Sequence, residues 1–350
     1  MWEQDHGRRP WRLALLAIAA ILALVTAAGC GSSSDDGDSA ATGAQTTATT
    51  ADAGGEKECS VEGKKIQFVA PLKSNPTMQV MAAGFEQRAK ELGFDATVLM
   101  TDDAEPQRIL ALGQQAMTQG SDGMVIPPYD AALYPFIKQA SAAGIPIITT
   151  HSSVPDSEDL GMKQDIHPDP AQYGAEAARA IGEQIGGRGT VAVTQGGFNP
   201  IENAAAEAFT AAMKEQYPDV KVLKSQVEGF EPAAAISKAV SVLQSDGSIV
   251  AAYSTTGGGP RTWAGAADQA GKRLVIIGMD YTRPNLDLVR SGKVYAVVAQ
   301  PIYEEHADAV DALKAAICGE PVEAEVSAES PLVTTDNVDE YYDLLDRTGT

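Results

Sequence analysis

The sequence has 350 residues, 44% of them hydrophobic, which is enough to bury a core in each of two lobes of ordinary size. The formal net charge is −21, from 26 basic and 47 acidic side chains. Such a surface repels a polyanion, so the charge disfavours nucleic acid as a partner. The acidity otherwise indicates only a soluble surface, because net charge does not specify a fold.

The N-terminus has the layout of an export signal, with three arginines in residues 8–12 followed by an apolar run over 13–25. This run is shorter than the ~20 residues of a spanning helix. Ala27-Ala28-Gly29-Cys30 follows it and resembles a bacterial lipobox. The resemblance implies that residues 1–29 are a lipoprotein signal peptide and that Cys30 carries a lipid, which anchors the protein outside the cytoplasm. An uncleaved anchor with an incidental cysteine is the alternative.

Residues 30–58 are expected to form a flexible tether. From Gly31 to about Gly55 the sequence contains Gly, Ser, Thr, Ala and Asp with one Gln, and it has no large apolar residue. Such a segment buries too little apolar surface to offset the conformational entropy that it would lose on folding. A tether of this kind holds a domain near the membrane and leaves it free to turn.

From residue 65 onward, short β-rich runs alternate with Ala-rich helical patterns. Continuous apolar strands flanked by helices predict a parallel sheet that is covered on both faces. The expected strands are 66–70, 96–100, 123–126 and 146–150, and the expected helices are 78–92, 105–119 and 131–143.

The alternation breaks over residues 152–170, a polar segment with prolines that is expected to be an irregular crossing. It then restarts, which predicts a second α/β lobe. The expected helices there are 171–185, 201–216, 232–243 and 262–270, and the expected strands are 190–194, 221–227, 249–254 and 274–280.

Two cysteines follow Cys30. Cys59 precedes the first expected strand and Cys318 ends the last long helix of the first lobe. Strands begin and helices end at the same edge of a parallel α/β layer, and the extracytoplasmic compartment is oxidising. We therefore expect a Cys59–Cys318 disulfide. A metal or redox site is the weaker interpretation, because neither a CxxC motif nor a nearby histidine pair is present.

Several short segments, in this order and spacing, resemble the type 1 periplasmic binding proteins and, within them, the ribose-binding group. The segments are Ser74-Asn75-Pro76, Glu91-Leu92-Gly93, Gly144-Ile145-Pro146-Ile147-Ile148-Thr149, Ile277-Gly278-Met279-Asp280, Ser291-Gly292-Lys293, Ala299-Gln300-Pro301 and Leu332-Val333-Thr334-Thr335-Asp336-Asn337-Val338. The resemblance runs from about residue 65 to residue 345.

The resemblance implies an α/β fold of two Rossmann-like lobes with parallel sheets, joined by a three-crossing hinge. The crossings are expected near Gln164, Gln300 and Pro331. The first lobe then comprises residues 65–163 and 302–330, and the second comprises 165–300 and 332–350. Ligands lie beyond the carboxyl ends of such strands, in the cleft between the lobes, and the family mechanism is hinge closure.

Asp280, Gln300 and Asn75 match ligand-binding positions of the family, and Met78 is a further candidate one turn after Asn75. Asp280 can accept two hydrogen bonds from a polyol, or it can cap the next turn instead. Gln300 offers both a donor and an acceptor at the second crossing. Asn75 either binds the ligand or simply caps the first helix, and Met78 either lines the cleft or packs in the core.

Phe230 matches an aromatic residue that stacks on a sugar ring, with core packing as the alternative. The chain departs from ribose binders at His151-Ser152, Asn203 and Thr255, where the family has an Asp-Arg pair, an arginine and an asparagine. Losing two arginines removes charge-assisted donors, so ribose is not the expected ligand. His151 is equally compatible with a structural hydrogen bond.

The resulting expectation is a monomeric substrate-binding lipoprotein of an ABC importer, which binds a small neutral sugar or polyol and works with permease subunits. Enzyme activity is not expected, because the chain has no dinucleotide fingerprint, P-loop, GxSxG or HExxH motif, and no cofactor or metal is expected either. The alternative is a receptor that presents a furanosyl signal or another ligand to a chemosensory or sensor-kinase partner.

Overall fold

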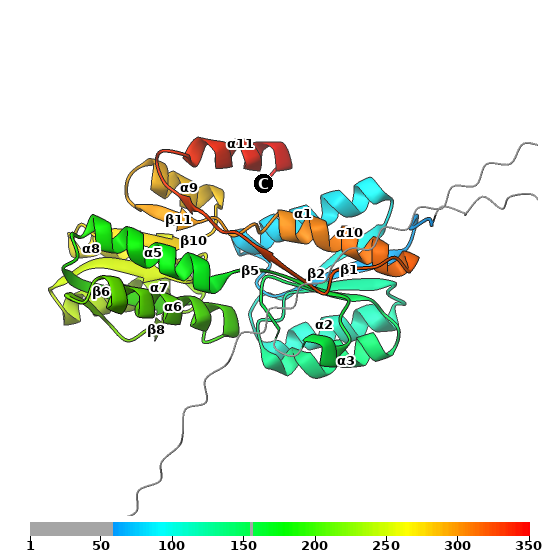
Figure 1. Cartoon of the computed structure of the whole chain (residues 1–350). Coiled ribbons are helices and arrows are strands. Elements are labelled where there is room, and N and C mark those ends of the chain that lie inside the picture. Colours follow the sequence, from blue (N-terminus) through cyan, green and yellow to red (C-terminus); the bar gives the residue numbers. More distant parts are fainter. Residues whose placement is uncertain (1–58, 155–156) are drawn as a thin grey trace, which may run out of the picture. The chain divides into compact units, whose positions relative to one another are not determined.

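The computed structural model describes residues 59–154 and 157–350 (Figure 1). The signal peptide, the tether and the lipid-bearing Cys30 expected from the sequence lie outside the described residues. Within the described ranges, no helix combines the length and the apolar character needed to cross a membrane.

The first lobe is built on a parallel sheet with the strand order β12-β5-β4-β3-β1-β2. Its strands are β1 (Lys65–Ala70), β2 (Asp95–Met100), β3 (Gly123–Ile126), β4 (Ile147–Thr150), β5 (Gln164–Pro168) and β12 (Glu325–Ala328). Its helices are α1 (Pro76–Leu92), α2 (Pro106–Thr118), the 3-10 turn η1 (Ala131–Leu133), α3 (Tyr134–Ala142), α4 (Ser157–Leu160) and α10 (Glu304–Cys318).

Alternating strand residues bury both faces of this sheet. Phe68 of β1 packs in the core shared with α1 and α10, whereas its neighbour Val69 packs in the core shared with α2 and α3. Figure 1 shows α1 and α10 on one side of the sheet and α2 and α3 on the other. The layered α/β arrangement expected from the sequence is therefore present.

The second lobe has the strand order β13-β11-β10-β9-β6-β7, with the short β8 also pairing with β6. Its strands are β6 (Gly189–Gln195), β7 (Val220–Val222), β8 (Gln226–Val227), β9 (Ile249–Ser254), β10 (Val275–Met279), β11 (Ala296–Val298) and β13 (Leu332–Val333). Its helices are α5 (Pro170–Gln184), α6 (Pro200–Gln216), α7 (Pro232–Ser245), α8 (Gly259–Ala270), α9 (Arg283–Arg290) and α11 (Val338–Thr348). All of these strands run parallel except β13, which is antiparallel to β11.

The second sheet is also covered on both faces. Tyr253 of β9 packs with Phe209 of α6 at a ring distance of 4.4 Å, in the core that includes α5. The preceding residue Ala252 packs in the other core, with Trp263 of α8. The helices α5 and α6 approach closely at Gly174, where an added Cβ would lie 2.6 Å from the carbonyl oxygen of Ala205.

The structure corrects two expectations about secondary structure. Residues 164–168 are not irregular but form β5, which pairs with β4 and β12 of the first sheet. The hydrophobic pattern does not predict this strand, because several of its buried side chains are polar. Their polar groups are satisfied by hydrogen bonds within the protein: Asp165 accepts hydrogen bonds from Thr149 Oγ1 (2.7 Å) and Val154 N (2.8 Å). The strand expected over 221–227 is split into β7 and β8, and Ser225 between them donates to the Gln195 side chain at 2.7 Å.

Three segments connect the two sheets. The first follows β5, at residues 168–170, so Gln164 lies inside the first sheet and not at the expected crossing. The second joins β11 to α10 and contains Gln300, and the third joins β12 to β13 and contains Pro331. The latter two crossings lie where the sequence predicts them.

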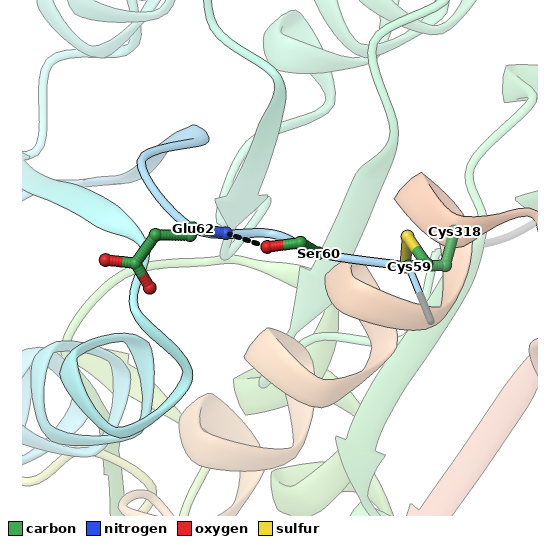
Figure 2. The surroundings of a disulfide bond; sticks show 4 residues. All are labelled: Cys59, Ser60, Glu62 and Cys318. Carbon is green, nitrogen blue, oxygen red and sulfur yellow. Dashed lines mark hydrogen bonds between the residues drawn. A yellow bond between two sulfur atoms is a disulfide. The ribbon is translucent and has the colours of Figure 1, made fainter. Parts of the chain in front are cut away.

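Cys59 and Cys318 form the expected disulfide (Figure 2). The bond links the segment before β1 to the C-terminal end of α10, residues that are 259 positions apart in the sequence. It lies at the edge of the sheet where β1 begins, which is the edge opposite to the carboxyl ends of the strands.

Candidate ligand-binding site

A cavity of about 260 Å³ lies beyond the carboxyl ends of the strands and is lined by residues of both lobes. Seven of the residues predicted from the sequence line it: Asn75, Met78, His151, Phe230, Thr255, Asp280 and Gln300. The position agrees with the general rule that ligands of open parallel sheets bind at this edge.

The start of α1 supplies one wall of the cavity. Asn75 is the N-cap of α1, and its Oδ1 accepts a hydrogen bond from Thr77 N at 2.9 Å. Pro76 occupies the first helical turn, where its missing N–H costs nothing. Asn75 thus caps the helix and lines the cavity as well, and Met78 is both a core residue and a lining residue.

Asp280 follows β10 and reaches the cavity from the second lobe. Its backbone has a φ of 70° and the residue is 2% exposed. Oδ2 accepts a hydrogen bond from Thr77 Oγ1 at 2.7 Å, whereas Oδ1 has no partner among the described residues. Burial raises the pKa of Asp280, although the charge of His151 and the Thr77 hydrogen bond oppose this. Thr282 is the N-cap position of α9, so Asp280 does not have the capping role.

His151 follows β4 at a φ of 69° and contacts a buried carboxylate that the sequence did not indicate. Its Nδ1 lies 3.5 Å from Glu305 Oε2, and Glu305 is 1% exposed. At this distance the two groups form an ion-pair contact and not a well-made hydrogen bond. Burial alone lowers the pKa of His151, but the contact with Glu305 and nearby carboxylates raise it above its usual value.

Glu202 is a second carboxylate that lines the cavity, and the sequence predictions missed it. Its Oε2 accepts hydrogen bonds from Gly196 N (2.6 Å) and Thr255 Oγ1 (3.1 Å), and its Oε1 accepts from Asn199 Nδ2 (2.8 Å). Burial is the main cause that raises the pKa of Glu202 to about 7. The sequence does contain a pattern that points to Glu202: Asn199 and Glu202 have the spacing of a capping box, which places Glu202 in the first turn of α6.

Two predicted residues do not line the cavity. Asn203 accepts a hydrogen bond from Gln195 Nε2 at 2.9 Å, away from the lining side chains, and the adjacent Glu202 lines the cavity instead. Ser152 is buried at 1% exposure and its Oγ has no partner among the described residues. Successive residues point in different directions, so an error of one position moves a side chain out of the site.

Aromatic side chains form much of the remaining wall. Phe230 is 41% exposed at the cavity, which excludes core packing as its role. Phe198 is 67% exposed and was not predicted. Tyr129 stands edge-on to the His151 ring at 6.1 Å, and Tyr173 also lines the cavity. Aromatic faces of this kind accept C–H groups of sugars or cationic groups.

The described residues contain no group of three His, Cys, Asp or Glu side chains placed to hold a metal ion. The lining of the cavity consists of hydrogen-bonding groups, aromatic rings and a few apolar side chains. Its polar groups converge from both lobes on one small cavity, an arrangement suited to holding a polar molecule.

Comparisons with known proteins agree with this architecture. A xylitol-binding protein of Mycolicibacterium smegmatis is 25% identical over 229 residues, and the match spans 64% of each chain, just under two thirds of that protein. The ribose import binding protein of Bacillus subtilis is 23% identical over 280 residues, which cover 79% of this chain and 90% of the relative.

A solved glucose-galactose binding protein of Geobacillus stearothermophilus superposes with a TM-score of 0.73 at 22% identity, covering 79% of this chain and 99% of that one. Residues 66–321 match the family described as the periplasmic binding protein domain. The chain therefore belongs to the periplasmic binding protein family, with the type 1 fold of the ribose-binding-like group.

Proposed function

We propose that this protein is the substrate-binding component of an ABC importer and that it binds a sugar or a sugar-like polyol in the cavity between its lobes. The observation that carries the proposal is Asp280 Oδ1, a buried acceptor at the cavity that has no hydrogen-bond partner within residues 59–154 and 157–350. A buried carboxylate oxygen is stabilised by a hydrogen-bond donor, and a hydroxyl group of a ligand supplies one.

The dimensions of the cavity fit a ligand of monosaccharide size. Its volume of about 260 Å³ falls just below the ~300 Å³ lower end for drug-sized ligand sites. The names of the relatives point the same way, because those proteins are called xylitol-binding and ribose import proteins.

Ribose itself is not the ligand that we propose. The described lining residues include neither Arg nor Lys, so the cavity lacks the charge-assisted donors that the ribose-binding group directs at ring hydroxyls, and His151 and Thr255 stand where that group has an aspartate and an asparagine. Both of these residues line the cavity, which makes them candidates for the groups that define specificity.

We further propose that the ligand is bound by hinge closure and that Cys30 carries the lipid anchor. The three connections between the sheets are short, which suits a hinge of a few residues that absorb the change in backbone angles. The anchor is supported by the lipobox-like sequence before Cys30. Anchoring would keep the binding protein beside the permease that receives its ligand.

Isothermal titration calorimetry against pentoses, hexoses, acyclic polyols and their amino derivatives tests this function. We expect one class to bind with one molecule per chain, and we expect Asp280→Ala to weaken that binding by about 2 kcal/mol. Asp95→Asn, an exposed residue of β2 away from the cavity, is the matched control and should bind normally. Absence of heat with every class, for protein shown to be folded, would rule the proposal out.

A further inference from the structure

Acidic side chains outnumber basic ones in the described lining of the cavity. Asp130, Glu202 and Asp280 line it, and Glu305 lies buried behind His151. Among the described residues, the lining contains neither Lys nor Arg. His151 is the basic side chain of the described lining, and its charge is shared between Asp280 and Glu305, whose Oε2 lies 3.5 Å from His151 Nδ1.

Among the carboxylates that line the cavity, Asp280 is the buried one with an oxygen that has no hydrogen-bond partner among the described residues, namely Oδ1. Asp280 is 2% exposed, and Thr77 Oγ1 is the single donor in the described part of the chain that reaches its Oδ2. Glu202, by contrast, already has three donors on its two oxygens. A buried carboxylate with one hydrogen bond and like charges nearby is costly to keep ionised, and an opposite charge at Oδ1 relieves that cost more than a neutral donor does.

The walls of the cavity also favour a cation. Tyr129, Tyr173, Phe198 and Phe230 line it together with the acidic groups. Aromatic faces attract ammonium groups through the ring quadrupole, and the attraction grows when the group is partly removed from water. The rings can also pack against the C–H groups of a neutral sugar, but a hydroxyl group gains neither this electrostatic attraction nor an ion pair with a carboxylate.

We propose that the ligand of this cavity carries a protonated amine in addition to hydroxyl groups, as an amino sugar or an aminopolyol does, and that the ammonium group pairs with Asp280. This rests on the proposed function, in that the cavity between the lobes is the ligand site, and it narrows the substrate class from polyols in general. Phosphorylated and carboxylated sugars are disfavoured on the same grounds, because the described lining contains neither Lys nor Arg to neutralise them beside its three carboxylates.

The test compares ligands that differ only in the charged group. D-glucosamine and D-glucose, D-galactosamine and D-galactose, and glucamine and sorbitol are titrated into the whole mature protein at neutral pH, with the N-acetylated amino sugars as uncharged controls. We expect the amine of at least one pair to bind at least tenfold more tightly than its hydroxyl partner, and acetylation to remove the difference.

A substitution assigns the effect to Asp280. In Asp280→Asn the ratio of the two affinities should fall to about one, whereas Asp95→Asn, which removes the same charge at an exposed position, should keep it. A thermal unfolding curve for each variant shows that the protein is folded. Retention of the amine preference in Asp280→Asn would overturn the assignment.

The outcomes also separate this inference from the function on which it rests. Hydroxyl partners that bind as tightly as the amines, or more tightly, overturn the amine inference and leave sugar or polyol binding intact. Failure of both members of every pair to bind overturns the amine inference for these ligands, and the function on which it rests is overturned as well only if pentoses, other hexoses and acyclic polyols also give no heat.

Discussion

Thr77 and Asp280 are 203 residues apart, and the hydroxyl of Thr77 donates a buried hydrogen bond of 2.7 Å to Asp280 Oδ2. Thr77 belongs to α1 of the first lobe, and Asp280 follows β10 of the second lobe. The bond therefore joins the two lobes at the cavity itself. Gly257 permits this approach, because a Cβ at that position would lie 2.3 Å from Asp280 Oδ2 and 2.4 Å from Thr77 Oγ1.

Thr77→Val keeps the shape of the side chain and removes the donor. If closure over the ligand uses this bond, the dissociation constant should rise about tenfold, since a hydrogen bond to a charged group contributes roughly 1.5 to 3 kcal/mol and part of that is recovered from water. Calorimetry measures this change with whichever sugar, polyol or amine binds in the titrations proposed above. Thr97→Val, at an exposed position of β2, is the matched control, and equal affinities of the two variants would contradict the expectation.

Gly257→Ala should weaken ligand binding more than Thr77→Val does. The added methyl group displaces both Thr77 and Asp280, so the cavity loses the position of its buried carboxylate as well as the bond between the lobes. Gly247→Ala is a suitable control, because nothing lies within 4 Å of a Cβ at Gly247. If Gly257→Ala binds the ligand as tightly as the control does, then Thr77 and Asp280 move aside for the methyl group without weakening ligand binding.

Glu202 predicts a specific pH dependence of stability. The pKa of Glu202 is raised from 4.5 to about 7 in the folded protein. Between pH 4.5 and pH 7 the folded protein therefore keeps a proton on Glu202 that the unfolded chain has released. The stabilisation is fully present below about pH 4.5 and is lost as the pH rises through 7, with an upper limit of about 3 kcal/mol.

Denaturant unfolding at pH 5 and pH 7.5 measures this dependence. The difference in the free energy of unfolding between the two pH values should shrink in Glu202→Gln, which cannot titrate. Glu207→Gln changes an exposed residue of the same helix and should leave the difference as it is in the unaltered protein. If the free energy of unfolding still differs as much between the two pH values in Glu202→Gln, another group is responsible for the pH dependence. Glu228 is one such group, because burial raises its pKa to about 7 as well.

Removing the disulfide should lower stability without affecting the site. The bond closes a loop of 259 residues, and replacing Cys59 and Cys318 together by serine should reduce the free energy of unfolding by about 2 to 5 kcal/mol. Ligand affinity should change less than twofold, since the disulfide lies at the opposite edge of the sheet from the cavity. A large loss of affinity with little loss of stability would mean that the bond positions the lobes.

Cys30→Ser tests the proposed anchor. Without the thiol that accepts the lipid, the exported protein should move from the membrane fraction to the soluble fraction after cell lysis. Fractionation followed by detection of the protein checks this, with the Cys59/Cys318 double serine variant as a control that retains Cys30. Unchanged retention of Cys30→Ser in the membrane would favour an uncleaved hydrophobic segment.

The sequence by itself determined the alternation of strands and helices, because apolar periodicity and capping residues are local properties. It also placed Asn75, His151, Asp280 and Gln300 at one cavity, since the ends of parallel strands share an edge. It failed at β5, whose polar residues are buried only because partners elsewhere satisfy them.

Only the tertiary structure decided which distant groups meet. Neither the His151–Glu305 contact nor the Thr77–Asp280 bond follows from any spacing along the chain. Glu202 lines the cavity and Asn203 does not, because the helix rotates about 100° from one residue to the next and the packing of α6 fixes which side faces inward. The charge of the cavity, and hence the kind of ligand proposed for it, depends on burial and on these pairings, which arise only when the whole chain is folded.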